Sequence, residues 1–169
     1  MQVVIVRHAK AEDAGTGPDG PRRPDAERAL TSSGRQYARL AGRVLDRLCP
    51  GVDALAVSPL RRAAETGALI ARQYKRLEPV PLPALAPAGS ARGVLKWLHE
   101  FPEDATVVLV GHEPDLSRLA GWLMTGAAES VIELKKGAIC LIEFRAAPAA
   151  GHGSLRWLLA LAQVRALRR

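Results

Sequence analysis

The chain has 169 residues, of which 48% are hydrophobic and 24% charged, enough for one domain with a sizeable core. This composition excludes a disordered chain, and no apolar stretch reaches the roughly 18 residues that a membrane-spanning helix needs. The opening run MQVVIVRH is too short for a secretory signal, and Cys49 and Cys140 lack CxxC or metal-site spacing. We therefore expect a cytoplasmic protein that needs no metal and no cofactor.

The net charge is +7, and Arg supplies most of the 24 basic residues. A guanidinium group matches phosphate oxygens bidentately, so this surface suits phosphate ligands. Enrichment of Arg together with Ala, Pro and Gly also fits codon bias, which is the simpler explanation. A basic nucleic-acid-binding protein is disfavoured, because aromatic residues make up only 4% and no nucleic-acid motif is present.

The first half of the chain alternates between predicted strands and helices. A short β-branched run predicts a buried strand, and a stretch rich in Gly, Pro and charge predicts a long loop. Thr31 is typical of a helix N-cap, and Pro50-Gly51 ends that helix. The predicted elements are a strand at 3–6, a loop at 10–29, the helix from Thr31, a strand at 54–57 and a helix at 61–74.

The second half continues this alternation after a Pro-rich stretch around one short strand. We expect helices at 91–101 and 116–124, strands at 106–110, 130–134 and 138–144, and a strand or helix at 155–162. The pattern predicts an α/β fold, a three-layer α/β/α arrangement with a mainly parallel central sheet. We expect a single domain at 1–163, followed by a basic C-terminal tail at 164–169.

Three polar clusters each follow a predicted strand directly. Arg7-His8 follows VVIV, the run SPLRR at 58–62 follows ALAV, and GHEP at 111–114 follows VVLV. Taken singly, each cluster is better explained as a surface pair, a helix start or a turn. Ligands of open α/β sheets bind at the carboxyl ends of strands, so the three together predict one site.

These motifs resemble those of the histidine phosphatase superfamily, which has a phosphoglycerate mutase-like fold. The resemblance rests on RHAK at 7–10, L-T-x-x-G at 30–34, S-P-x-x-R-A-x-x-T at 58–66 and GHEP at 111–114. Within the superfamily the chain is similar to the short, SixA-like phosphohistidine phosphatases, including L-x-P-x-G at 85–89. The motifs occur in order over nearly the whole chain.

The resemblance implies a nucleophile at His8, with Arg7 before it binding phosphate. It assigns the second arginine to Arg62, since this residue precedes the alanine of R-A-x-x-T and Arg61 occupies a variable position. It assigns the second histidine to His112.

Three further positions carry weaker implications. Arg28 is expected to be a weaker substrate contact beside Arg7 and Arg62. Ser58 and Thr66 are expected to have structural roles in the turn and helix.

Two positions depart from the family pattern. Ala9 replaces the usual glycine after the histidine, which requires a negative φ there. Larger members carry an acidic proton donor after the third strand, but the segment LAPAGSARG has no carboxylate. The general acid is therefore Glu12, Asp13, Glu113 or none.

The resemblance implies phosphoryl transfer through a phosphohistidine intermediate on His8, without metal. A site without a strong acid favours P–N bonds, because imidazole leaves more readily than an alkoxide. The short chain has no insertion for a lid, which suits a protein substrate. We expect a phosphorylated protein of the histidine phosphotransfer or phosphocarrier type, with phosphate or other oxyanions in the site and no membrane partner. The alternatives are a small-molecule phosphatase or mutase, and a non-catalytic phosphoprotein- or nucleic-acid-binding module.

Overall fold

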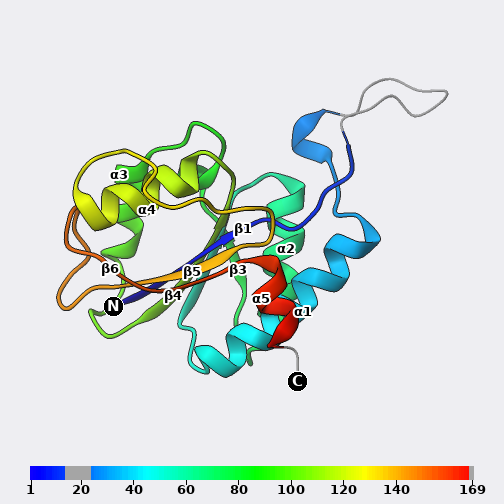
Figure 1. Cartoon of the computed structure of the whole chain (residues 1–169), viewed down its shortest axis with the longest axis horizontal. Coiled ribbons are helices and arrows are strands. Elements are labelled where there is room, and N and C mark those ends of the chain that lie inside the picture. Colours follow the sequence, from blue (N-terminus) through cyan, green and yellow to red (C-terminus); the bar gives the residue numbers. More distant parts are fainter. Residues whose placement is uncertain (14–23, 168–169) are drawn as a thin grey trace.

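The computed structural model of the chain describes residues 1–13 and 24–167. A six-stranded sheet forms the middle layer, in the order β3-β2-β4-β1-β5-β6 (Figure 1). Strands β3, β2, β4 and β1 run parallel, whereas β5 is antiparallel to both of its neighbours. The strands are β1 (Gln2–Arg7), β2 (Ala54–Val57), β3 (Pro79–Pro81), β4 (Thr106–Gly111), β5 (Ile139–Glu143) and β6 (Ser154–Leu159).

Helices cover both faces of the sheet. Helices α1, α2 and α5 pack on one face and α3 and α4 on the other (Figure 1). The described helices are α1 (Ser32–Leu48), α2 (Arg61–Ala71), α3 (Ala91–Leu98), α4 (Asp115–Thr125) and α5 (Leu161–Ala166), with short 3₁₀ turns η1 (Asp25–Glu27) and η2 (Pro83–Leu85). The predicted three-layer α/β/α fold with a mainly parallel sheet is confirmed.

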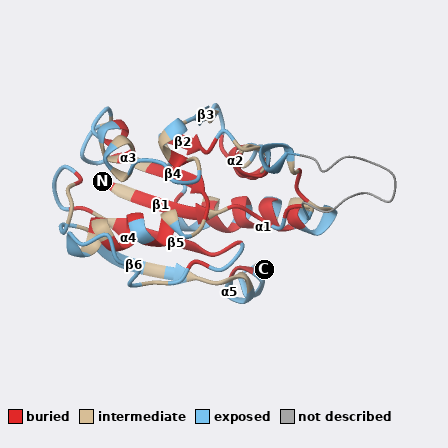
Figure 2. Cartoon of the chain, turned by 90° about the horizontal axis from the view of Figure 1, so that it is seen from above, coloured by how far each residue is buried: buried red, intermediate tan, exposed pale blue. Residues whose placement is uncertain are grey.

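Alternating side chains of the central strands build the two halves of the core. In β1, Val4 and Val6 pack toward α1 and α2, while Val3 and Ile5 pack toward α3 and α4. Figure 2 shows β1 and β4 buried in the middle of the molecule, with β6 more exposed at the edge. Strands buried on both faces explain the continuous apolar runs of the sequence.

The N-terminus of α1 is fastened to the segment that follows β1. Thr31 caps the helix, since its Oγ1 accepts from Gly34 N at 3.0 Å and donates to Lys10 O at 3.1 Å. A Cβ on Gly34 would lie 2.1 Å from Lys10 O, so only glycine permits this approach. The L-T-x-x-G motif therefore holds α1 against the chain just beyond His8.

The predicted strand at 130–134 is wrong. In this segment Leu134 N donates to Ser117 Oγ at 3.3 Å, and Leu134 O accepts from Arg7 Nη1 at 2.9 Å. Side chains thus satisfy backbone groups that a strand would pair with a neighbouring strand. Of the two predicted strands in this region, only β5 forms.

The C-terminal region forms both a strand and a helix, β6 and α5. The predicted boundary between the domain and a basic tail, at 163/164, falls inside α5. Val164 is fully buried in the core cluster that contains the α1 residues, which explains why the helix continues past this point. That residues 1–163 form a single domain stays a prediction.

Of the predicted loop at 10–29, residues 14–23 lie outside the described part, and its end contains η1. Among the described helices, none is long and apolar enough to cross a membrane.

Candidate active site

Three adjacent parallel strands deliver the three polar clusters to one edge of the sheet. Strand β4 lies between β1 and β2, and Arg7 at the end of β1 pairs with Gly111 at the end of β4. Beyond the strand ends, His8 N donates to Gly111 O at 3.1 Å and Ser58 N donates to Val110 O at 2.9 Å. Residues about 100 positions apart in sequence therefore meet at this edge.

The His8 imidazole is buried and held by the backbone next to it. Its Nδ1 lies 2.7 Å from Ala9 O, and a carbonyl oxygen can only accept, so Nδ1 carries the proton. The ring therefore presents the lone pair of Nε2. Ala9 N in turn donates to Thr66 Oγ1 at 3.2 Å, and Thr66 Oγ1 donates to Arg62 O at 2.7 Å.

Alanine is compatible with the position after the histidine. Among the described non-glycine residues, only Arg76 and Ala88 have a positive φ. Ala9 therefore needs no glycine, and its methyl group is buried in the core cluster of α1 and α2.

The second histidine, His112, lies against the first. The two ring centroids are 5.0 Å apart, with an interplanar angle of 55°. His112 Nε2 is 2.7 Å from Ser58 Oγ, which also accepts from Leu60 N at 3.3 Å. A Ser58 hydroxyl that donates to Nε2 leaves the ring proton on Nδ1. This Nδ1 is buried and has no hydrogen-bond partner within the described residues.

Two arginines reach the same edge from opposite sides. Arg7 Nη1 donates to Leu134 O at 2.9 Å, and Arg62, only 5% exposed, donates from Nη1 to Asp25 O at 2.7 Å and from Nη2 to Asp25 Oδ2 at 2.9 Å. The Nε atoms of both arginines are buried with no acceptor in the described part of the chain. Buried donors of this kind are expected to bind a ligand or water.

Arg28 and Arg61 have different positions relative to the site. Arg28 Nε lies 3.0 Å from Asp25 Oδ1, so Asp25 bridges Arg28 and Arg62. Arg61 is exposed and forms an ion pair with Glu65 at 2.7 Å, one helical turn along α2. The structure thus brings Arg28 to the edge of the site and leaves Arg61 on the surface.

Burial and positive charge keep both histidines neutral. Burial lowers the pKa of His8 to about 4, outweighing the Ala9 hydrogen bond, and the charges of Arg62 and Arg7 lower it further. Burial lowers the pKa of His112 to about 3, and the charges of His8 and Arg62 act in the same direction. At neutral pH, His8 therefore has a free lone pair and His112 remains uncharged.

The carboxylates named from the sequence occupy different surroundings. Asp13 is exposed, and Glu12 lies beside the short bridge between Ala11 and Leu30. Glu113 is half-buried beside Ser117, and burial raises its pKa, although Ser117 and the charge of Arg7 oppose this rise. The pKa of Glu113 thus moves toward that of a proton donor.

Sequence reasoning missed two carboxylates that lie at the candidate site, Asp25 and Asp115. Partial burial would raise the pKa of Asp25, but the hydrogen bond and charge of Arg62 lower it, so it stays ionised. Asp115, in the first turn of α4, accepts from Ala88 N at 2.8 Å and so holds residues 85–93, the segment without a carboxylate that we call the acid-free loop. Its position just after GHEP was a usable signal, whereas nothing in the sequence around Asp25 indicates its contact with Arg62.

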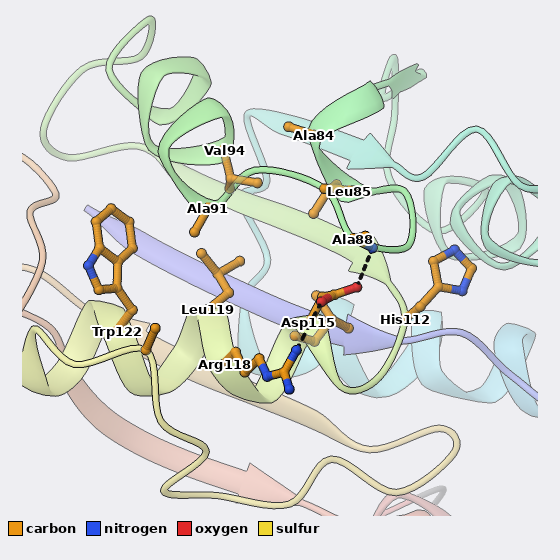
Figure 3. Close-up of a pocket in the computed structure, with 13 residues that line it drawn as sticks. Ala84, Leu85, Ala88, Ala91, Val94, His112, Asp115, Arg118, Leu119 and Trp122 are labelled. Atoms are coloured by element: carbon orange, nitrogen blue, oxygen red, sulfur yellow. Dashed lines mark hydrogen bonds and ion pairs between the residues drawn. The ribbon is translucent and has the colours of Figure 1, made fainter.

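An open cavity of about 330 Å³ extends from His112 along α4. Figure 3 shows its two walls, with Leu119 and Trp122 of α4 facing Leu85 and Val94 across the space. The walls are mostly apolar, and Asp115 and Arg118 are among the polar side chains in the lining. The cavity can accept an apolar group attached to a ligand at His112.

No set of three or more His, Cys, Asp or Glu side chains in residues 1–13 and 24–167 is arranged to hold a metal ion. The polar groups at the strand ends are instead cationic and neutral donors around His8. Such donors suit an oxyanion.

Residues 3–87 match the model of the histidine phosphatase superfamily (branch 1). An uncharacterized protein of Picosynechococcus sp. is 31% identical in an alignment that covers 94% of this chain and 99% of that protein. The chain belongs to the histidine phosphatase superfamily.

Among solved structures, the chain is similar in fold and sequence to SixA. The protein histidine phosphatase SixA, complexed with tungstate, has a TM-score of 0.80 and 25% identity, covering 97% of this chain and 99% of that one. The α-ribazole phosphatase from Shigella flexneri shares the fold, with a TM-score of 0.72, 20% identity and coverage of 95% and 97%. The SixA-like resemblance drawn from the motifs is confirmed.

The tautomer and the pKa of His8 can be tested directly. Nitrogen-15 NMR of the imidazole rings should show a proton on Nδ1 of His8 and a pKa near 4, because the Ala9 carbonyl fixes the tautomer and burial disfavours the cation. Comparison with His8→Ala assigns the signals. Titration of His8 near its ordinary value of about 6.5, or a proton on Nε2, would contradict this geometry.

Proposed function

We propose that this histidine phosphatase hydrolyses phosphohistidine on proteins, with His8 as the nucleophile. The observation that carries the proposal is the set of buried donors around His8 that have no acceptor in the described chain. They are Arg7 Nε, Arg62 Nε and, with the Ser58 hydroxyl taken as the donor to His112 Nε2, His112 Nδ1. We call these three groups the oxyanion cage. Arg28 Nε also lacks a hydrogen bond, but it is ion-paired with Asp25.

The oxyanion cage suits the charge that develops during phosphoryl transfer. Negative charge spreads over the equatorial oxygens of phosphorus, and preorganised donors stabilise it. Leu134 O and Asp25 hold the outer nitrogens of Arg7 and Arg62, so the buried Nε groups are already oriented. Arg28 acts more weakly, through Asp25, at the edge of the same site.

The proposed reaction has two steps. His8 Nε2 attacks phosphorus, the P–N bond to the substrate imidazole breaks, and the phosphoryl group moves to His8. Water then attacks the phosphorus atom and the P–N bond to His8 breaks. Inorganic phosphate leaves with the oxygen and protons of that water, and Nε2 keeps its electron pair, so His8 is neutral again. The hydrogen bond from Nδ1 to Ala9 O persists through both steps and stabilises the positive charge that forms on the ring.

The preference for P–N bonds follows from the acid-free loop. The loop beside His112 contributes Ala88 and Gly89 to the cavity, and the nearby Asp115 carboxylate accepts from Ala88 N. Glu113, with its raised pKa, is not among the residues that line the cavity. Imidazole protonated on its other nitrogen leaves as a neutral molecule, so it does not require a donor.

A small-molecule phosphomonoesterase or mutase is the second candidate. The apolar cavity beside His112 could hold the organic part of such a substrate. Structures with the same fold include an α-ribazole phosphatase and a phosphoserine phosphatase of Entamoeba histolytica. Tungstate in the SixA structure supports an oxyanion ligand in either case.

A non-catalytic role is the third candidate, as a module that binds phosphoproteins or nucleic acid. Such a module would bind its ligand without turnover, and binding to nucleic acid would weaken steeply with salt.

The cytoplasm is the proposed compartment, because both cysteines are free thiols buried in the core.

The two neighbouring arginines of α2 make a matched pair for mutation. Arg62→Ala should lower turnover by at least about a hundredfold, because a donor to the transition state is lost. Arg61→Ala removes the same charge from the surface and should have a much smaller effect. Steady-state kinetics of both variants check this, and equal effects would show that Arg62 does not bind the phosphoryl group.

Leaving-group dependence tests the substrate class. In assays with EDTA, a phosphohistidine peptide and activated aryl phosphates should be hydrolysed, while sugar and serine phosphates should react slowly. A general acid typically contributes about a hundredfold to ten-thousandfold, so log turnover should fall steeply as leaving-group pKa rises.

A flat dependence would reveal a proton donor and favour the small-molecule candidate. Glu12, Asp13, Glu113 and Asp115 would then be replaced in turn. Absence of turnover on every substrate, with phosphate still bound, would favour the non-catalytic module.

A further inference from the structure

A second cavity lies on the α1 side of the site. Its volume is about 190 Å³, and we call it the basic pocket because three of its lining residues are cationic. The residues that line it are Lys10, Ser33, Gly34, Tyr37, Lys136, Leu161 and Arg165. None of them lines the apolar cavity beside His112, so the two cavities are separate.

The three cations come from three segments whose backbones are fixed independently. Lys10 O accepts from both Thr31 N and Thr31 Oγ1, which attaches it to the start of α1. The turn that carries Lys136 closes through Ala138 N and Lys135 O at 2.7 Å, and the Tyr37 hydroxyl donates to Gly137 O.

Arg165 is positioned by α5. The preceding residue, Val164, is fully buried against the core, and Leu161 of the same helix lines the pocket. Burial raises the pKa of Tyr37, and the charge of Arg165 opposes this rise, which indicates that the guanidinium lies near the phenol.

The basic pocket contains positive charge without a compensating carboxylate. No ion pair involves Lys10, Lys136 or Arg165 within residues 1–13 and 24–167. Two other cations near this edge do have carboxylate partners, since Asp25 pairs with Arg62 and Glu65 pairs with Arg61. Three like charges around one cavity repel each other, and an anion placed among them would relieve that repulsion.

The basic pocket adjoins the oxyanion cage through the backbone. Lys10 follows His8 by two residues, and the turn of Lys136 leads into Ala138, whose carbonyl accepts from Arg7 N at 3.1 Å. The same segment contains Leu134, which holds the Arg7 side chain. A molecule with its phosphoryl group on His8 can therefore extend over this side of the edge.

We propose that the basic pocket binds a carboxylate side chain of the substrate protein, close to its phosphohistidine. This inference rests on the proposed function. A folded protein presents a phosphohistidine and a neighbouring Asp or Glu on one rigid surface, and so can contact His8 and the separate basic pocket together. Charge complementarity of this kind gives orientation and speeds association.

Binding of two peptides tests the proposal without requiring turnover. Both contain phosphoryltriazolylalanine, a stable mimic of phosphohistidine, and differ only in having three flanking Glu or three Gln residues. The protein should bind the Glu peptide on the order of tenfold more tightly at low salt, as expected from several exposed ion pairs. The combined variant Lys10→Ala, Lys136→Ala, Arg165→Ala should lose this preference.

A matched variant separates the pocket from the net charge. Lys75→Ala, Arg92→Ala, Lys96→Ala removes the same charge from exposed positions elsewhere and should keep the preference. Circular dichroism and thermal unfolding verify that both variants fold. Equal binding of the two peptides by the unmodified protein, or equal losses in the two variants, would overturn the proposal.

Turnover of a phosphohistidine peptide by the unmodified protein is measured separately. A Glu preference without such turnover would reject the proposed function while retaining the basic pocket as an anion site. Turnover without a Glu preference would reject the basic pocket alone.

Discussion

The hydrogen bond from His8 Nδ1 to Ala9 O, 2.7 Å long, determines which nitrogen of His8 is available. That bond depends on the position of Ala9, whose N–H is held by Thr66 of α2. Thr66 also bonds the backbone of Arg62, one helical turn earlier. This short chain of contacts therefore sets the tautomer of His8 and ties the start of α2, with Arg62, to the segment after β1.

Charge at the carboxyl edge of the sheet is distributed unevenly. Asp25 pairs with Arg28 and Arg62, and Glu65 pairs with Arg61, whereas the Nε groups of Arg7 and Arg62 are buried without a hydrogen-bond partner in the described chain. Burial together with these cations lowers the pKa values of His8 and His112, so both rings are neutral at pH 7. The positive charge of the site therefore comes from its arginines and not from its histidines. The two flanks differ as well, with an apolar cavity along α4 and a basic pocket beside α1. A matching substrate would carry its phosphoryl group between an apolar group, which fits the cavity along α4, and a carboxylate, which fits the basic pocket.

Much of this arrangement could be predicted from the sequence because it depends on local patterns. Buried parallel strands give continuous apolar runs, and polar residues directly after them must lie at one edge. By contrast, residues 130–134 contain a β-branched run, yet Ser117 and Arg7 bind the Leu134 backbone. Contacts of that kind are tertiary, as are those of Asp25 with Arg62 and of Val164 with the core, and no local pattern encodes them.

If His8 receives the phosphoryl group, a covalent phosphohistidine must form on the protein during turnover, and this intermediate can be trapped. Rapid quench of the protein with a phosphorus-labelled substrate, followed by peptide mapping, locates the transferred phosphate. The account predicts acid-labile, base-stable label on His8, attached through Nε2, and no label in His8→Ala. Label on a different residue, or full turnover by His8→Ala, would contradict the account.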